Sequence, residues 1–186
     1  MTSTRDEAFD KGEFLEWAHG ELLDNRNRGI VAEFIVAKAL GLAGTRRVEW
    51  DDVDLVYEGR SIEIKSAANL QSWEQTAPVN CKFNIPKKMA YWDEKLGRRL
   101  PLDPPCRMAD LYVLCHFKET DRLNANPLCP EQWDFYVLAS ATIEEQFGDQ
   151  KQVALPRVQD CCEALGYNAL RDRIEAFKTG DHQDRS

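Results

Sequence analysis

Two short runs of alternating apolar and polar residues lie close together in the first half of the chain. They read DLVY at residues 54–57 and SIEIK at residues 61–65. Alternation with a period of two is typical of β-strands, and a glycine-containing turn between two such runs predicts a β-hairpin. The sequence therefore predicts a hairpin over residues 54–65, with a two-residue loop at either Glu58-Gly59 or Gly59-Arg60.

This hairpin is predicted to have one charged face and one apolar face. Residues two apart on a strand share a face, so Glu63 and Lys65 project together. Either loop places Asp54 on the same face, opposite one of the two, where cross-strand Cβ atoms are about 5 Å apart. The other face collects the apolar residues Val53, Leu55, Tyr57, Ile62 and Ile64. Two carboxylates and an ammonium group are therefore expected to meet beside a hydrophobic core.

Helical spacing of apolar residues precedes the hairpin, over about 10–23 and more densely over about 27–41. Glu33 lies inside the second of these predicted helices. A carboxylate in such an apolar run is costly unless it is paired or bound to a cation. Glu33 is therefore a candidate for the charged site. The alternatives are that it reaches solvent or pairs with Arg26 or Lys38.

The rest of the chain predicts a mixed series of elements. Pro86 suits the first turn of a helix, which is expected over 86–97. Near-continuous apolar runs at 110–117 and 133–139 predict strands that are buried on both faces. The remaining expectations are short strands at 45–50, 81–85 and 153–155, a loop or short helix at 66–80, and helices at 140–147, 156–166 and 167–178. Together these elements predict a single α/β domain over 1–180 with a mixed sheet, followed by a disordered tail at 181–186.

Composition and charge narrow the classes of protein. No apolar run approaches the ~20 residues of a membrane span, and the N-terminus has no apolar signal-peptide segment, so a cytoplasmic protein with no membrane partner is expected. The net charge of −8 argues against a general polyanion binder. Residues 82–107 nevertheless carry seven basic and three acidic residues, a local charge of +4. The candidates for phosphate contacts are Arg26, Arg28, Lys87, Lys88 and Arg107, although an ordinary solvated surface explains the same charges equally well.

The charged face of the hairpin suits a hard divalent cation. Mg²⁺ prefers oxygen ligands, usually one or two carboxylates with waters and phosphate oxygens. The candidate ligands are Asp54, Glu63, the carbonyl of Ile64 and, as a third carboxylate, Glu33. A metal there would polarise a phosphodiester, and Lys65 would orient or deprotonate the attacking water. An ordinary solvated face is the alternative, because an acid followed by Glu-X-Lys also arises by chance.

Asp54, followed after eight residues by Glu63-Ile64-Lys65 and preceded by Glu33 in a helix, resembles the PD-(D/E)XK nuclease superfamily. The stretch EIKSAANLQSWEQ is also similar to uncharacterised bacterial proteins of that superfamily. The resemblance implies a restriction-endonuclease-like αβββαβ core over about 27–117, with a mixed central sheet and extra C-terminal helices. It also implies Mg²⁺ or Mn²⁺ bound by Asp54 and Glu63, with Lys65 as the motif lysine. Val53 stands where the motif has proline.

The resemblance further implies a metal-dependent nuclease that acts on DNA rather than RNA, and it leaves a homodimer open. Some members carry a further glutamine after the lysine, and Gln75 or Gln71 would fill that place, with Gln75 taken as the catalytic candidate. Asp51 and Asp52 are rival ligands, but the register of Asp54 with Glu63 is better determined. The alternative is a catalytically inactive member of the same fold that binds nucleic acid or protein.

Overall fold

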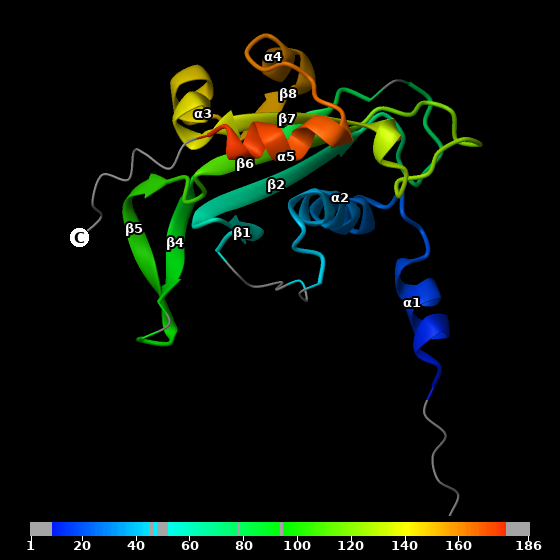
Figure 1. The fold of residues 1–186 in the computed structure, drawn as a ribbon, viewed down its shortest axis with the longest axis horizontal. Coiled ribbons are helices and arrows are strands. Elements are labelled where there is room, and N and C mark those ends of the chain that lie inside the picture. The colour runs from blue at the N-terminus through cyan, green and yellow to red at the C-terminus, as the bar shows by residue number, and fades with distance from the viewer. Residues whose placement is uncertain (1–8, 45–46, 48–51, 78, 94, 178–186) are drawn as a thin grey trace, which may run out of the picture.

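A four-stranded mixed sheet forms the centre of the computed structural model, which describes residues 9–44, 47, 52–77, 79–93 and 95–177 (Figure 1). Its strands are β1 (Leu55–Tyr57), β2 (Arg60–Ala68), β6 (Leu111–Phe117) and β7 (Trp133–Ala139), in the spatial order β1-β2-β6-β7. The pairs β1–β2 and β6–β7 are antiparallel, whereas β2 and β6 are parallel. The predicted mixed α/β fold is confirmed at this level.

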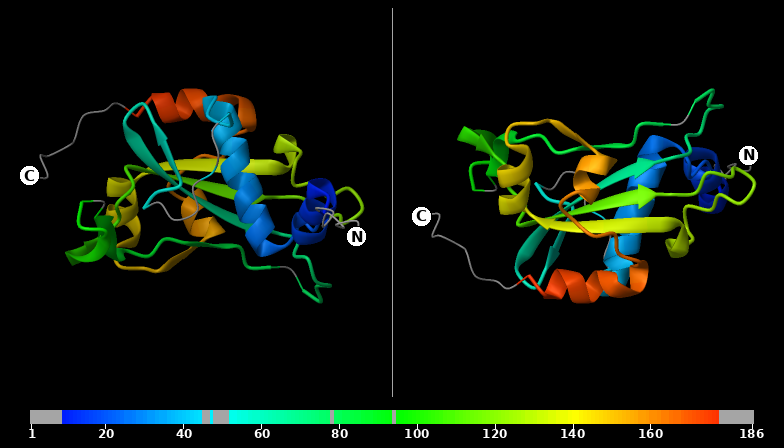
Figure 2. Two further views of the ribbon diagram at one scale, coloured as in Figure 1. Left: turned by 90° about the horizontal axis from the view of Figure 1, so that it is seen from below. Right: turned by 90° about the horizontal axis from the view of Figure 1, so that it is seen from above.

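Both faces of the sheet are covered (Figure 2). One face carries the helices α2 (Asn25–Leu40) and α5 (Tyr167–Glu175). The other carries α3 (Ser140–Phe147), α4 (Leu155–Gln159) and the two-stranded sheet of β3 (Lys82–Asn84) and β8 (Gln152–Ala154). All seven residues of β6 are consequently buried, as its near-continuous apolar run predicted.

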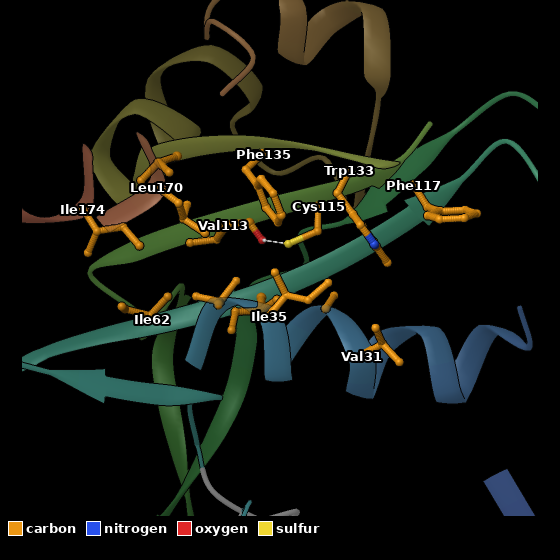
Figure 3. Packing of buried hydrophobic residues seen from close by; sticks show 14 of the residues in the cluster. Val31, Ile35, Ile62, Val113, Cys115, Phe117, Trp133, Phe135, Leu170 and Ile174 are labelled. Atoms are coloured by element: carbon orange, nitrogen blue, oxygen red, sulfur yellow. Dashed lines mark hydrogen bonds between the residues drawn. The ribbon is translucent and has the colours of Figure 1, made fainter. Parts of the chain in front are cut away.

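A hydrophobic core beneath α2 and α5 packs these helices against the sheet and so positions them relative to β2 (Figure 3). Val31 and Ile35 project from α2 towards the sheet and share one cluster with Ile62 on β2, and Leu170 and Ile174 join this cluster from α5. Burial of one such side chain contributes roughly 1.5–3 kcal/mol. The helix that carries Glu33 is thereby held against the strand that carries Glu63.

The predicted hairpin is confirmed, with the loop at Glu58-Gly59. Leu55 pairs with Ile62 and Tyr57 with Arg60, which places Asp54 opposite Glu63. Both loop residues have positive φ, 49° at Glu58 and 77° at Gly59. Two residues of positive φ are what a type I′ turn requires, and that turn matches the twist of the two strands. The sequence left two loops open, and this backbone geometry selects one of them.

The helix predicted over 86–97 is wrong. This segment forms β4 (Lys88–Asp93), which pairs with β5 (Arg98–Cys106) in a separate two-stranded antiparallel sheet, the β4–β5 ribbon. Tyr91 and Trp92 favour strands over helices, and they pair with Leu100 and Arg99 across the ribbon. A ribbon, rather than the helix that the αβββαβ order requires, therefore lies in the crossover between β2 and β6 within the described residues.

The remaining elements follow the predicted order. The N-terminal helix is α1 (Lys11–His19), which buries none of its side chains, and a single 3₁₀ turn (Pro130–Gln132) precedes β7. The predicted strand at 45–50 falls almost wholly outside the described residues, as does the predicted tail at 181–186. None of the helices in the described ranges combines the length and the apolar character needed to cross a bilayer.

Candidate functional site

The structure brings Asp54, Glu63 and Lys65 together, as the hairpin register predicts. The Nζ atom of Lys65 lies 2.5 Å from Oε1 of Glu63 and 3.9 Å from Oδ2 of Asp54. Two carboxylates from adjacent strands therefore approach one ammonium nitrogen. The side chain of Glu63 is only 10% exposed, so this charged group lies at the margin of the packed interior.

The backbone of β2 holds Asp54 in place. The N–H of Ile64 donates to Oδ2 of Asp54 at 2.6 Å, and the N–H of Asp54 donates to the carbonyl of Ile62 at 3.1 Å. Burial raises the pKa of the Asp54 carboxyl, the ammonium of Lys65 opposes this effect, and the negative charge of Glu63 adds to it. The carboxylate is thus fixed in a position where its negative charge is costly.

Lys88 is a second cation at the same site. The sequence predicted it as a phosphate contact on a helix. Its Nζ lies 3.7 Å from Oε2 of Glu63 and also donates to the carbonyl oxygen of Asp52. Tyr112 faces Glu63 from the neighbouring strand β6, and burial, with a contribution from Glu63, raises the pKa of its phenol. Only the tertiary fold reveals Lys88 and Tyr112, because both are distant from the hairpin in sequence.

Glu33 lies near the site but is engaged elsewhere. Its carboxylate forms an ion pair with Arg47, in which Nη2 of Arg47 is 2.9 Å from Oε1 and Nε also donates to Oε2. Its charge still contributes to the raised pKa of Asp54, so the two carboxylates are within electrostatic range of each other. The pairing partner is neither of those suggested by the sequence, Arg26 or Lys38.

The donor set fits a divalent cation held by two carboxylates. Within the described residues, no group of three Asp, Glu, His or Cys side chains is arranged around one point. Mg²⁺ commonly takes only one or two protein carboxylates and completes its shell with water and substrate oxygens. Asp54 and Glu63 supply that number, and a cation beside them would offset the burial that raises the pKa of Asp54. In this structure Lys65 and Lys88 provide that charge.

The two candidate glutamines serve the loop that follows β2. Oε1 of Gln75 accepts from the N–H of Gln71, and its Nε2 donates to the carbonyl of Asn69 at 2.9 Å. Gln71 is buried and donates to the carbonyl of Ala68. Asn69 is four residues beyond Lys65, about 13 Å along a strand. The structure thus shows Gln75 bracing the loop, and its catalytic role stays a prediction.

Two of the predicted phosphate contacts, Arg28 and Arg107, have buried guanidinium groups that bind within the protein, and their role in phosphate binding stays a prediction. Arg28 is 2% exposed and donates to the carbonyl of Leu23 and to Oδ1 of Asn25. Arg107 is 4% exposed; it donates to the carbonyls of Ile85, Gly148 and Gln150, and its Nη1 lies 2.8 Å from Oε1 of Glu144. Sequence cannot distinguish a buried arginine that ties loops together from an exposed one.

Lys87 is partly exposed and already neutralised. Its Nζ lies 2.8 Å from Asp149 and 3.1 Å from Glu144, and these two hydrogen bonds raise the pKa of the ammonium group. A phosphate at Lys87 would have to compete with both acids. Among Arg28, Lys87, Lys88 and Arg107, Lys88 is therefore the residue that stands at the candidate site.

A cavity of about 320 Å³ adjoins Lys88, between the β4–β5 ribbon and the chain that enters β1. It is lined by Asp52, Lys88, Met89, Ala90 and Arg99. The rival ligand Asp52 does not lie free in this cavity, since its Oδ2 accepts from the N–H of Trp92 at 3.0 Å. The other rival, Asp51, lies outside the described residues.

Comparison of the chain with known protein families, with curated proteins and with solved structures finds no match.

Proposed function

We propose that this protein is a metal-dependent nuclease that hydrolyses phosphodiester bonds, with DNA as the preferred substrate. The observation that carries the proposal is the position of Lys65, 2.5 Å from Glu63 and 3.9 Å from Asp54 on the charged face of one hairpin. Two acids and a lysine in such a position can supply the metal ligands and the group that acts on the attacking water in metal-assisted phosphodiester hydrolysis.

The proposal assigns each group a separate task. Asp54 and Glu63 would hold Mg²⁺ or Mn²⁺, with the carbonyl of Ile64 beside them, and such an ion supplies Lewis-acid stabilisation of the developing negative charge. Lys65 would orient the attacking water or neutralise charge on the scissile phosphate, since it is already adjacent to both acids. Glu33 would contribute a further carboxylate only after release from Arg47.

The order of elements supports a restriction-endonuclease-like core as part of the proposal. A helix, α2, is followed by the antiparallel pair β1–β2, and β6 then adds in parallel to β2. The pair β1–β2 carries the aspartate and the Glu-X-Lys motif, which is the arrangement expected from the superfamily that the sequence resembles. The ribbon in place of a crossover helix is the point at which the described residues differ from that core.

The test is cleavage of single-stranded, duplex and branched DNA, and of RNA, by the purified protein with Mg²⁺ or Mn²⁺ over a range of salt. Lys65→Ala and Glu63→Gln are each expected to lower the rate by about 10²- to 10⁴-fold. Lys87→Ala is the matched control, because Lys87 also bridges two acids and its side chain is 27% exposed, against 28% for Lys65. Intact substrates with the wild-type protein, or full activity in Lys65→Ala, would reject the proposal.

A non-catalytic binding module is the second candidate, and one observation favours it. The three candidate carboxylates already have cationic partners within the protein, Lys65 for Asp54, Lys65 and Lys88 for Glu63, and Arg47 for Glu33. A scaffold would need no metal to balance this charge. Titration with Mn²⁺ separates the two candidates, because a nuclease site binds the ion through Asp54 and Glu63 and a scaffold does not.

A further inference from the structure

The β4–β5 ribbon stands apart from the central sheet, next to the candidate site. Over the residues that the structure describes it pairs with neither of the other sheets, and Figure 1 shows it projecting from the body beneath α3. A two-stranded ribbon without further packing is only marginally stable in water. Its root is nevertheless tied to the site, because Lys88 contacts Glu63 and the N–H of Trp92 binds Asp52.

One face of the ribbon differs in chemistry from the other. Trp92 and Arg99 are opposite one another on the two strands, and Ala90, two residues from Trp92, shares their face. This is the face that borders the cavity, which Ala90 and Arg99 help to line. Arg98 pairs with Asp93 at the next position along the strands, so it projects from the opposite face.

The cavity face combines exposed apolar groups with cations. Trp92 is 49% exposed, and Met89, which lines the cavity from the irregular start of β4, is 73% exposed, although both are large apolar residues. Arg99 is exposed, and it forms no ion pair with any residue that the structure describes. Proteins that bind unpaired nucleic acid use this combination, in which bases stack on aromatic rings while cations hold the backbone.

The size of the cavity limits what it admits. A volume of about 320 Å³ is at the lower end of the roughly 300–1,000 Å³ that small-molecule sites span. It suits a single nucleotide rather than a duplex about 20 Å across. Since Lys88 borders both the cavity and Glu63, a nucleotide in the cavity would lie close to a phosphate bound at the candidate site.

We propose that the cavity face of the β4–β5 ribbon, formed by Lys88, Met89, Trp92 and Arg99, binds an unpaired nucleotide next to the scissile phosphate. The base stacks on Trp92, and Arg99 contacts a backbone phosphate. The protein consequently prefers single-stranded or frayed DNA to closed duplex. The role of this subsite next to a scissile phosphate rests on the proposed nuclease function, but binding of the nucleotide itself requires no cleavage.

The experiment measures binding of fluorescein-labelled oligothymidylate in EDTA, where no metal-dependent cleavage occurs. Trp92→Ala is expected to weaken binding by about 5- to 150-fold, the range for loss of one stacked base. Trp92→Phe keeps an aromatic ring and is expected to retain most of the affinity. Trp17→Ala removes another exposed tryptophan, on α1, and is expected to bind within twofold of the wild type.

The two adjacent arginines provide the sharper comparison. Arg99→Gln is expected to weaken binding about tenfold, whereas Arg98→Gln, with the same charge change on the opposite face, is expected to remain within twofold. The subsite is overturned if Arg99→Gln and Arg98→Gln weaken binding equally, or if Trp92→Ala binds within twofold of the wild type. It is also overturned if Trp92→Phe binds as weakly as Trp92→Ala, or if the wild-type protein does not bind the oligonucleotide. If the binding pattern holds without any cleavage in Mg²⁺, the proposed nuclease function fails and the subsite stands. If the protein cleaves DNA in Mg²⁺ but the binding pattern is absent, the subsite fails and the proposed nuclease function stands.

Discussion

Replacing Lys65 with alanine is predicted to tighten the binding of a divalent metal ion while it slows cleavage. The Nζ atom of Lys65 lies against the oxygens of Glu63 and Asp54 that a metal ion would need. A cation already at those oxygens competes with an incoming one. Its removal leaves two carboxylates with less positive charge, and the pKa of Asp54 is already raised by burial.

The size of this effect follows from Coulomb's law. Two unit charges about 4 Å apart interact by about 1 kcal/mol at the dielectric constant of water, so one lysine opposes a divalent ion by about 2 kcal/mol. That free energy corresponds to about 30-fold in affinity. Because the Lys65 side chain is 28% exposed and can swing aside when the ion binds, a gain of about tenfold is the smallest expected.

Isothermal titration with Mn²⁺ at pH 7 measures the change, with Lys87→Ala as the matched variant. Lys87 also bridges two acids, but Asp149 is 90% exposed and Glu144 keeps its contact with Arg107. Lys87→Ala is therefore expected to leave Mn²⁺ binding as in the wild type. The reasoning is refuted if Lys65→Ala binds Mn²⁺ no more tightly than the wild type, or if Lys87→Ala gains as much.

Two further predictions concern stability. Asp54→Asn is expected to stabilise the metal-free protein by about 1 kcal/mol at neutral pH. Since the pKa of Asp54 is raised on folding from its ordinary value of 3.8, the wild-type protein loses stability as the pH rises through these two pKa values and the carboxyl ionises. The gain in the free energy of urea unfolding for Asp54→Asn should therefore shrink as the pH falls towards 4. No gain at pH 7, or a gain independent of pH, contradicts this. Arg107→Met is expected to cost about 3 kcal/mol, because it leaves the carbonyls of Ile85, Gly148 and Gln150 without their shared donor, while Glu144 keeps its contact with Lys87. A loss below about 1 kcal/mol in urea unfolding would show that Arg107 does not hold these segments together.

The parts of this fold that were predictable are those that short-range pattern determines. Alternation over residues 54–65 and the positive-φ preference of Gly59 specify the hairpin, and hence the register of Asp54 with Glu63. The near-continuous apolar run of β6 likewise specifies a strand buried on both faces. In each case the residues that decide the structure lie within about ten positions of one another.

The parts that were not predictable depend on contacts between distant segments. Residues 88–93 carry charged and apolar side chains at spacings that suit either a helix or a strand, and the strand prevails because β5 pairs with it. Arg28 and Arg107 become buried only when separate segments of the chain fold over them. Glu33 has several possible partners in sequence, and the structure pairs it with Arg47.

The root of the β4–β5 ribbon explains how one lysine belongs both to the ribbon and to the candidate site. Pro104 and Pro105 have no N–H to donate, so the ladder is interrupted there, and pairing resumes only where Cys106 faces Lys88. At this irregular end Lys88 reaches Oε2 of Glu63 at 3.7 Å while it borders the cavity. A nucleotide on the ribbon and a cation on Glu63 would therefore both alter the pairing of Lys88. Because coupling between two binding sites is reciprocal, the proposed nucleotide and metal sites should each change the affinity of the other.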